Sequence, residues 1–267
     1  MNEYIDSLVQ QEEMKRPPKD PHSMVTEIHP DIYFKYNSVN LVVGKRGSGK
    51  TYTTLREIFK LPLYFPDGQN KYTQIHYITD KENDDTVDKF RDLFEQAGMF
   101  FNWVPTENAE EVITGITAVK KLMTNDEFKA NEPDNYQLSK DCLNYNGDEL
   151  PHTIIIFDDC MGLFTKDTSL SKKLFENRQA RITYFLLLQD GFGVNAKMKS
   201  NIDTLVLFGG FSRQRLTPLL YELPPNDFDY SAYTRLSSHE AFIIDLKDGS
   251  VCLLNNFSNL SENDEYY

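Results

Sequence analysis

Residues 44 to 51 read Gly44-Lys45-Arg46-Gly47-Ser48-Gly49-Lys50-Thr51 and fit the pattern G-x-x-x-x-G-K-[ST] at every fixed position. Glycines let the backbone curl so that its N–H groups point inward at phosphate oxygens. A helix that follows such a loop directs its positive end at the same anion. The octapeptide therefore predicts a phosphate-binding loop; the alternative is a plain glycine turn between a strand and a helix.

The residues around the octapeptide have the context that such a loop requires. Val39 to Val43 is a short apolar run that predicts a buried strand, and a helix is expected from about Lys50 to Phe59. We expect Lys50 to reach the β and γ phosphates of ATP and the Thr51 hydroxyl to ligate Mg²⁺. All eight loop residues and the next residue, Tyr52, are candidate nucleotide contacts.

An acidic pair, Asp158-Asp159, ends a second apolar run, Thr153 to Phe157. Carboxylates resist burial, so an acidic pair at the tip of a buried strand indicates a function. We expect Asp158 to hold the Mg²⁺ site and Asp159 to orient and deprotonate the attacking water. The other interpretation is a strand that leaves the sheet in a polar turn.

The alternation of apolar runs with helical periodicity predicts an α/β fold: a three-layer P-loop NTPase of the RecA-like (ASCE) class. A strand between the loop strand and the acidic strand distinguishes this class. The sheet is expected to be mostly parallel, with a β-hairpin formed around Lys247-Asp248-Gly249. The polar stretch from Asn125 to Leu150 predicts an inserted loop that can include a short helix. We divide the chain into an N-terminal arm (1–36), an ATPase domain (37–257) and an acidic tail (258–267).

Composition limits the classes of function. The chain carries 28 Lys and Arg against 41 Asp and Glu, a formal net charge of −13, which argues against nucleic-acid binding over the whole surface. The three cysteines show no disulfide or zinc spacing. No apolar run reaches the length of a membrane span, and the first 20 residues lack the apolar core of a signal peptide. We therefore expect a cytoplasmic protein without a membrane partner.

A polar residue, Gln189, follows the apolar run Ile182 to Leu188. At the tip of a central strand it would face the γ-phosphate and sense hydrolysis; the alternative is an ordinary polar strand end. Arg178 and Arg181 precede this strand, and either is a candidate arginine finger for the nucleotide of a neighbouring subunit. The alternative for each arginine is a solvated charge or a local ion pair.

Together these motifs resemble the FtsK-HerA superfamily of DNA-pumping ATPases, and within it the genome-packaging ATPases of poxvirus-like large DNA viruses and virophages. The resemblance runs from about Val39 to Phe211. It is carried by the glycine-rich octapeptide, by Ile155-Ile156-Phe157-Asp158-Asp159, by Asn177-Arg178 eleven residues before Gln189, and by Lys199-Ser200-Asn201-Ile202.

The resemblance implies an ATP-driven translocase that packages viral double-stranded DNA into a capsid. It implies Arg178 as the finger, Gln189 as the sensor, a ring of five or six copies, and a capsid or vertex protein as partner. The expected location is the host cytoplasm, a viral factory or the virion. Two residues depart from the family: the broad class has Glu at the position of Asp159, and the family often has Arg at that of Lys199.

Basic residues gather between Lys172 and Lys199 in this acidic chain. We expect part of this segment to line a pore and to grip DNA phosphates without reading sequence; the alternative is a solvated charge run. The candidate DNA contacts are Lys172, Lys173, Lys197 and Lys199. Two other functions stay open: another DNA pump of the same superfamily, and a P-loop kinase or nucleotide-gated binding protein.

Overall fold

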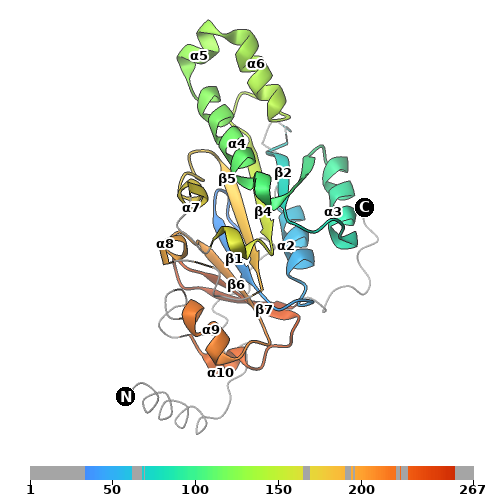
Figure 1. Ribbon diagram of the computed structural model, residues 1–267, viewed down its shortest axis with the longest axis vertical. Helices are drawn as coiled ribbons and strands as arrows, with labels where there is room; N and C mark the ends of the chain where they lie inside the picture. The colour runs from blue at the N-terminus through green and yellow to red at the C-terminus, as the bar shows by residue number, and fades with distance from the viewer. Residues whose placement is uncertain are drawn as a thin grey trace.

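The computed structural model describes residues 34–61, 68, 70–164, 169–189, 194, 196–220, 223 and 228–255. Within these residues an eight-stranded sheet has the order β3-β2-β4-β5-β1-β6-β7-β8 (Figure 1). Neighbouring strands are parallel from β3 to β6 in this order. Strand β7 pairs antiparallel with β6, and β8 pairs antiparallel with β7. The strands are Val39–Val43 (β1), Tyr72–Ile78 (β2), Phe100–Val104 (β3), His152–Asp158 (β4), Ile182–Leu188 (β5), Thr204–Phe208 (β6), Glu240–Asp245 (β7) and Val251–Asn255 (β8).

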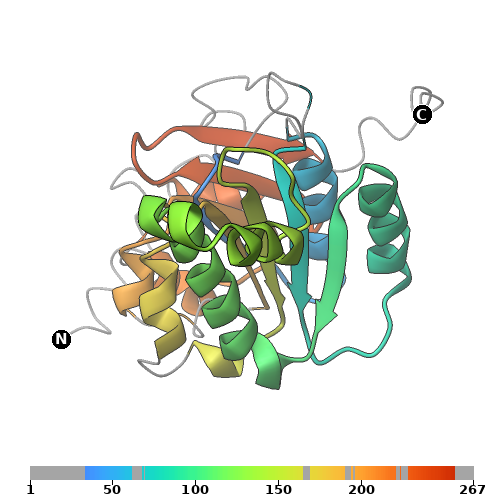
Figure 2. The same cartoon turned by 90° about the horizontal axis from the view of Figure 1, so that it is seen from above.

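Helices cover both faces of the sheet (Figure 2). Helices α2 and α3 pack on one face, and α4, α7, α8, α9 and α10 contribute to the core on the other. The helices are Lys50–Phe59 (α2), Asp85–Gln96 (α3), Ala109–Met123 (α4), Asp126–Asn131 (α5), Pro133–Cys142 (α6), Ser169–Leu174 (α7), Ala196–Lys199 (α8), Arg213–Leu220 (α9) and Tyr230–Tyr233 (α10), with short 3-10 helices at Thr106–Asn108 and Met161–Leu163.

The central strands β1, β4 and β5 are mostly apolar because both of their faces are covered. In β1, Leu41 and Val43 join the core under α4 and α7, whereas Val42 joins the core under α2 and α3. In β4, Ile155 and Ile156 divide in the same way between the two cores. The predicted three-layer α/β fold with a mostly parallel sheet and a C-terminal hairpin is therefore confirmed.

Strand β5 lies between β1, which leads into the glycine-rich loop, and β4, which ends in the acidic pair. It pairs with both strands in parallel register: Val43 lies beside Leu188, and Asp158 lies beside Leu187. The carboxyl ends of the three strands thus meet at one edge of the sheet. This order confirms the predicted class, in which a further strand separates the loop strand from the acidic strand.

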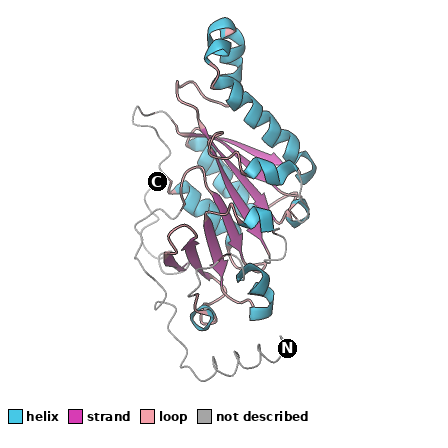
Figure 3. Ribbon diagram, turned by 90° about the vertical axis from the view of Figure 1, so that its left-hand side faces the viewer, coloured by secondary structure: helices cyan, strands magenta, loops and turns pink. Residues whose placement is uncertain are grey.

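The stretch from Asn125 to Leu150 corrects the predicted loop. It holds two helices, α5 and α6, which extend the end of α4 away from the sheet (Figures 1 and 3). The Asn125 side chain caps α5 by accepting bonds from the N–H groups of Glu127 and Phe128, and Pro133 starts α6. The segment is polar because most of it faces solvent, and its polarity therefore does not exclude helices.

Helix α7 ends at Leu174, and the chain turns from there to β5. Two of the predicted divisions of the chain reach outside the described residues. Residues 1–33 of the predicted arm and the predicted acidic tail lie outside the described residues. In the part of the chain that the structure covers, no helix is both long and apolar enough to cross a bilayer.

Candidate active site

The glycine-rich loop joins β1 to α2 and wraps around the Lys50 side chain. Gly47 and Gly49 have φ angles of 77° and 89°, which side chains with a Cβ rarely adopt. The Lys50 Nζ donates to the Gly44 carbonyl at 2.8 Å and to the Lys45 carbonyl at 3.3 Å. Burial lowers the pKa of Lys50, and the charges of Asp159 and Asp158 partly oppose this effect. The predicted loop thus holds a lysine at its centre.

A hydrogen bond joins the loop to the acidic strand. The Thr51 hydroxyl lies 3.2 Å from Oδ2 of Asp158, although the two residues are 107 positions apart in the chain. The Asp158 side chain is only 1% exposed, and the Tyr77 hydroxyl from β2 also donates to its Oδ2. Burial and the Asp158 charge raise the pKa of Tyr77, so the phenol stays protonated and remains a donor.

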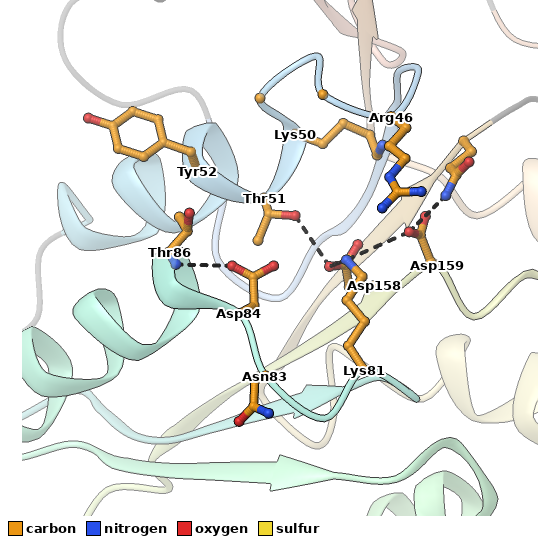
Figure 4. Close-up of a pocket in the computed structure, with 13 residues that line it drawn as sticks. Arg46, Lys50, Thr51, Tyr52, Lys81, Asn83, Asp84, Thr86, Asp158 and Asp159 are labelled. Atoms are coloured by element: carbon orange, nitrogen blue, oxygen red, sulfur yellow. Dashed lines mark hydrogen bonds and ion pairs between the residues drawn. The ribbon is translucent and has the colours of Figure 1, made fainter.

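Asp159 and Gln189 come together from the tips of neighbouring strands. The Gln189 Nε2 donates to Oδ2 of Asp159 at 2.9 Å. Asp159 has a φ of 59°, a left-handed conformation that is uncommon for a residue other than glycine. This backbone conformation follows directly on β4 and turns the second carboxylate beside the first, as Figure 4 shows.

The donors present suit a magnesium ion. Mg²⁺ prefers hard oxygen ligands and is usually held by one or two carboxylates together with substrate phosphates. Thr51 and Asp158 offer a hydroxyl and a carboxylate at the mouth of the loop. Oδ1 of Asp158 and Oδ1 of Asp159 are buried and have no hydrogen-bond partner among the described residues. These two unsatisfied oxygens fit a cation brought in with a nucleotide.

A cavity of about 750 Å³ opens at this edge of the sheet (Figure 4). Its volume is in the usual range for a small-molecule site. Of the loop residues, Gly44, Lys45 and Ser48 do not line it. The lining residues are Arg46, Gly47, Gly49, Lys50, Thr51, Tyr52, Lys81, Asn83, Asp84, Thr86, Asp158, Asp159 and Gln189.

The sequence did not point to the residues after β2 that line one side of this cavity. Lys81 forms an ion pair with Asp158, and Asp84 caps α3 beside it. Tyr77 was also missed. One signal could have found them: the residues that follow a strand of a mostly parallel sheet emerge at the same edge as Asp158.

The two candidate arginines lie at the opposite edge of the sheet. They precede β5, whose seven residues span roughly 20 Å from there to Gln189. The Arg178 side chain is 67% exposed and pairs with Asp203 at 3.3 Å. Arg181 donates to the Leu150 carbonyl at 2.7 Å and pairs with Glu149 at 3.2 Å. Neither arginine lines the cavity of its own subunit.

The four candidate DNA-binding lysines differ in exposure. Lys172 is exposed and Lys173 half-buried, both on α7, whereas the side chain of Lys197 lies outside the described part of the chain. Lys199 is only 9% exposed. Lys199 is therefore less accessible in the single subunit than Lys172, and all four DNA contacts stay predictions.

Comparisons with known proteins find solved structures of the same fold. No protein-family model and no curated protein matches the chain. The DNA-packaging ATPase B204 from Sulfolobus turreted icosahedral virus has a TM-score of 0.53 at 14% identity, over 83% of this chain and 98% of that one. The genome packaging NTPase B204 from Sulfolobus turreted icosahedral virus 2, in complex with AMP, has a TM-score of 0.51 at 14% identity, over 85% and 98%.

A third similar structure is EssC (ATPases 2 and 3) from Geobacillus thermodenitrificans. Its TM-score is 0.50 at 14% identity, over 81% of this chain and 39% of that one. At such identities the likeness establishes the P-loop NTPase fold alone.

Proposed function

We propose that this chain binds ATP with Mg²⁺ in the cavity at the carboxyl ends of β1, β4 and β5 and hydrolyses it. The observation that carries the proposal is the hydrogen bond between Thr51 and Asp158, because it joins the end of the phosphate loop to a buried carboxylate. That pairing is the one expected of a loop threonine and a strand-end aspartate that share a magnesium ion. A plain glycine turn needs no such partner.

Each side chain of the site has a separate role in hydrolysis. Lys50 offsets the negative charge on the transferred phosphoryl group, and Thr51 and Asp158 would hold a magnesium ion, which would supply positive charge to the phosphates. Asp159 accepts the proton of the attacking water. Gln189 holds Asp159 by one carboxylate oxygen and leaves the other without a partner among the described residues. Because Asp is one methylene shorter than Glu, the water has to bind close to the tip of β4.

The arrangement of the arginines supports a ring. Arg178 is exposed and lies at the edge of the sheet away from its own cavity, so as a finger it would serve a neighbouring subunit. Arg181 is committed to Leu150 and Glu149, which favours Arg178. We therefore propose a closed ring of five or six copies, in which each subunit completes the site of the next.

We further propose that the ring moves double-stranded DNA into a viral capsid, as a member of the FtsK-HerA superfamily. Two of the structures that share the fold are described as viral packaging enzymes. The net charge of −13 restricts DNA to a local basic surface, and the exposed Lys172 on α7 suits such a surface. A capsid or vertex protein is the partner that this activity requires.

The test is steady-state ATP hydrolysis with and without double-stranded DNA across a range of protein concentrations. Lys50→Ala provides the background. A ring motor with fingers in trans is expected to hydrolyse faster with DNA, and its activity per subunit should rise steeply with concentration. Hydrolysis that responds to neither variable would contradict the motor and point to a self-contained P-loop enzyme.

Joint replacement of Lys172 and Lys173 by Ala is expected to weaken DNA binding and to reduce its salt dependence. Each DNA phosphate that the protein no longer neutralises makes the slope of log affinity against log salt shallower by about 0.9. The measurement is fluorescence anisotropy of a labelled duplex at several salt concentrations.

The matched control for this pair is the double replacement of Lys89 and Lys121 by Ala, because both are exposed lysines on other helices, α3 and α4. An equal loss of affinity in both double variants would mean that DNA senses only the total charge and would remove α7 from the DNA path.

A further inference from the structure

Lys81 lies close to two of the acidic residues that line the cavity, Asp158 and Asp159. Its Nζ lies 2.7 Å from Oδ2 of Asp158 and 3.7 Å from Oδ2 of Asp159. Figure 4 shows the side chain rising from the segment after β2 to reach both carboxylates. An ammonium group thus occupies the position between two carboxylates where a cation is expected.

We infer that Lys81 is an exchangeable counter-ion of the nucleotide site. It offsets part of the negative charge of Asp158 and Asp159 in the absence of nucleotide, and it would leave Asp158 when a magnesium ion arrives with the nucleotide. The inference rests on the proposed function and adds a positioning residue to it.

The carboxylates require such a partner in the empty site. Asp158 is almost fully buried, and an unpaired buried carboxylate is strongly destabilising. Thr51 and Tyr77 supply neutral donors to its Oδ2, and Lys81 supplies the positive charge. Burial by itself lowers the pKa of Lys81, but the hydrogen bond to Asp158 and the charges of Asp158, Asp159 and Asp84 outweigh it, so the pKa is raised.

The same geometry makes Lys81 incompatible with a second cation at its present position. Oδ2 of Asp158 already accepts bonds from Thr51, Tyr77 and Lys81, so a metal ion would approach Asp158 through its free oxygen, Oδ1, and would then share one carboxylate with the Lys81 ammonium group. Lys81 also lowers the pKa of Lys50, although burial has the larger effect, so the two ammonium groups repel each other. A divalent ion would add to that repulsion.

The Lys81 side chain is free to move away from Asp158. Its side chain is 38% exposed, and lysine has a long stem with several rotatable bonds. Asp158, by contrast, is fixed at the end of β4 and by its bonds to Thr51 and Tyr77. Metal binding is thus expected to move the lysine and to leave the carboxylate in place.

Lys60 offers a matched control. Its side chain is 46% exposed and pairs at 3.3 Å with Glu57, whose side chain is as buried as that of Asp158. Lys60→Met therefore removes an ion pair to a buried carboxylate outside the cavity, although Arg56 stays paired with Glu57 at 2.7 Å. Lys81→Arg keeps the positive charge in place, whereas Lys81→Met keeps the length of the side chain and removes the charge.

The first test measures the affinity for a fluorescent ADP in excess Mg²⁺ and in EDTA. The ratio of the two affinities reports how much Mg²⁺ helps binding. It is expected to be about three- to fivefold larger in Lys81→Met than in the natural chain, because Mg²⁺ no longer has to displace an ion pair of this strength. Lys81→Arg and Lys60→Met are expected to keep the natural ratio. An equal or smaller ratio in Lys81→Met would overturn the inference.

The second test needs no nucleotide. Without nucleotide, Lys81→Met is expected to unfold at a lower temperature than the natural chain or Lys60→Met, and Mg²⁺ should restore more of its Tm than choline chloride of equal ionic strength. A Tm of Lys81→Met that Mg²⁺ does not raise selectively would contradict the counter-ion role. If the natural chain bound no ADP, the proposed function would fail, and this second test would still decide the role of Lys81.

Discussion

Lys50→Ala is expected to lower steady-state ATP hydrolysis by at least about 10³-fold while the fold is kept. The expected size follows from removing a charge that stabilises the transferred phosphoryl group inside a preorganised site. Lys50 is buried, and its ammonium donates to two backbone carbonyls of its own loop, so it is aimed at whatever the loop encloses. The measurement is phosphate release at saturating ATP, together with circular dichroism to verify folding.

Lys60→Ala is the control for this prediction because it changes a lysine at the end of the same helix and outside the cavity. It is expected to keep hydrolysis within about twofold, as is usual for an exposed ion pair. If Lys50→Ala retained hydrolysis well above the background of the preparation, the loop would not act as a catalytic phosphate site, and the ATPase proposal would fall.

Arg178→Ala is expected to lower the maximal rate of hydrolysis by about 10³-fold, the lower end of the range for an arginine finger. Nucleotide affinity should change little because Arg178 does not line the cavity of its own subunit. The fold should also persist, since Asp203 keeps Lys247 at 2.8 Å and the Val39 N–H at 2.9 Å as partners. The rate is measured at saturating ATP and at a protein concentration that favours rings.

Mixing variants separates a finger in trans from a local structural role. A Lys50→Ala subunit has an inactive phosphate loop but keeps Arg178. It is therefore expected to restore activity to the site of an adjacent Arg178→Ala subunit. Arg181→Ala serves as the comparison: its bonds to Leu150 and Glu149 predict a loss of stability without a large loss of rate. Two inactive variants that stay inactive when mixed would rule out a finger from a neighbouring subunit.

Much of the site was predictable because its signals are local. About 20 consecutive residues hold the apolar run of β1, the glycines of the loop and the start of α2. The motif directly predicts a strand, a loop and a helix in this order. The acidic pair was recognisable because burying carboxylates is costly, so two of them at the end of an apolar run indicate a function. The parallel order of β1, β5 and β4 then brings both signals and Gln189 to one edge, as the class of fold predicted.

Other features depended on contacts between residues far apart in the chain. Lys81 and Asp158 are 77 positions apart, and a lysine in a polar loop gives no sign of the carboxylate that it will meet. The burial of Lys199 was equally invisible, since a charged residue in a basic segment looks exposed. The helices α5 and α6 were missed because their stabilising contacts are caps and packing on α4, and their polar sequence has little helical periodicity.

The sequence by itself thus determined the chemistry of the site: a phosphate loop with Lys50 and Thr51, and the acids Asp158 and Asp159. These follow from short-range rules on backbone conformation and burial. Only the tertiary structure decided which charge balances that site when it is empty, and which arginine stays exposed. Both depend on distances across the sheet, because electrostatic partners are chosen by proximity in space and not by position along the chain.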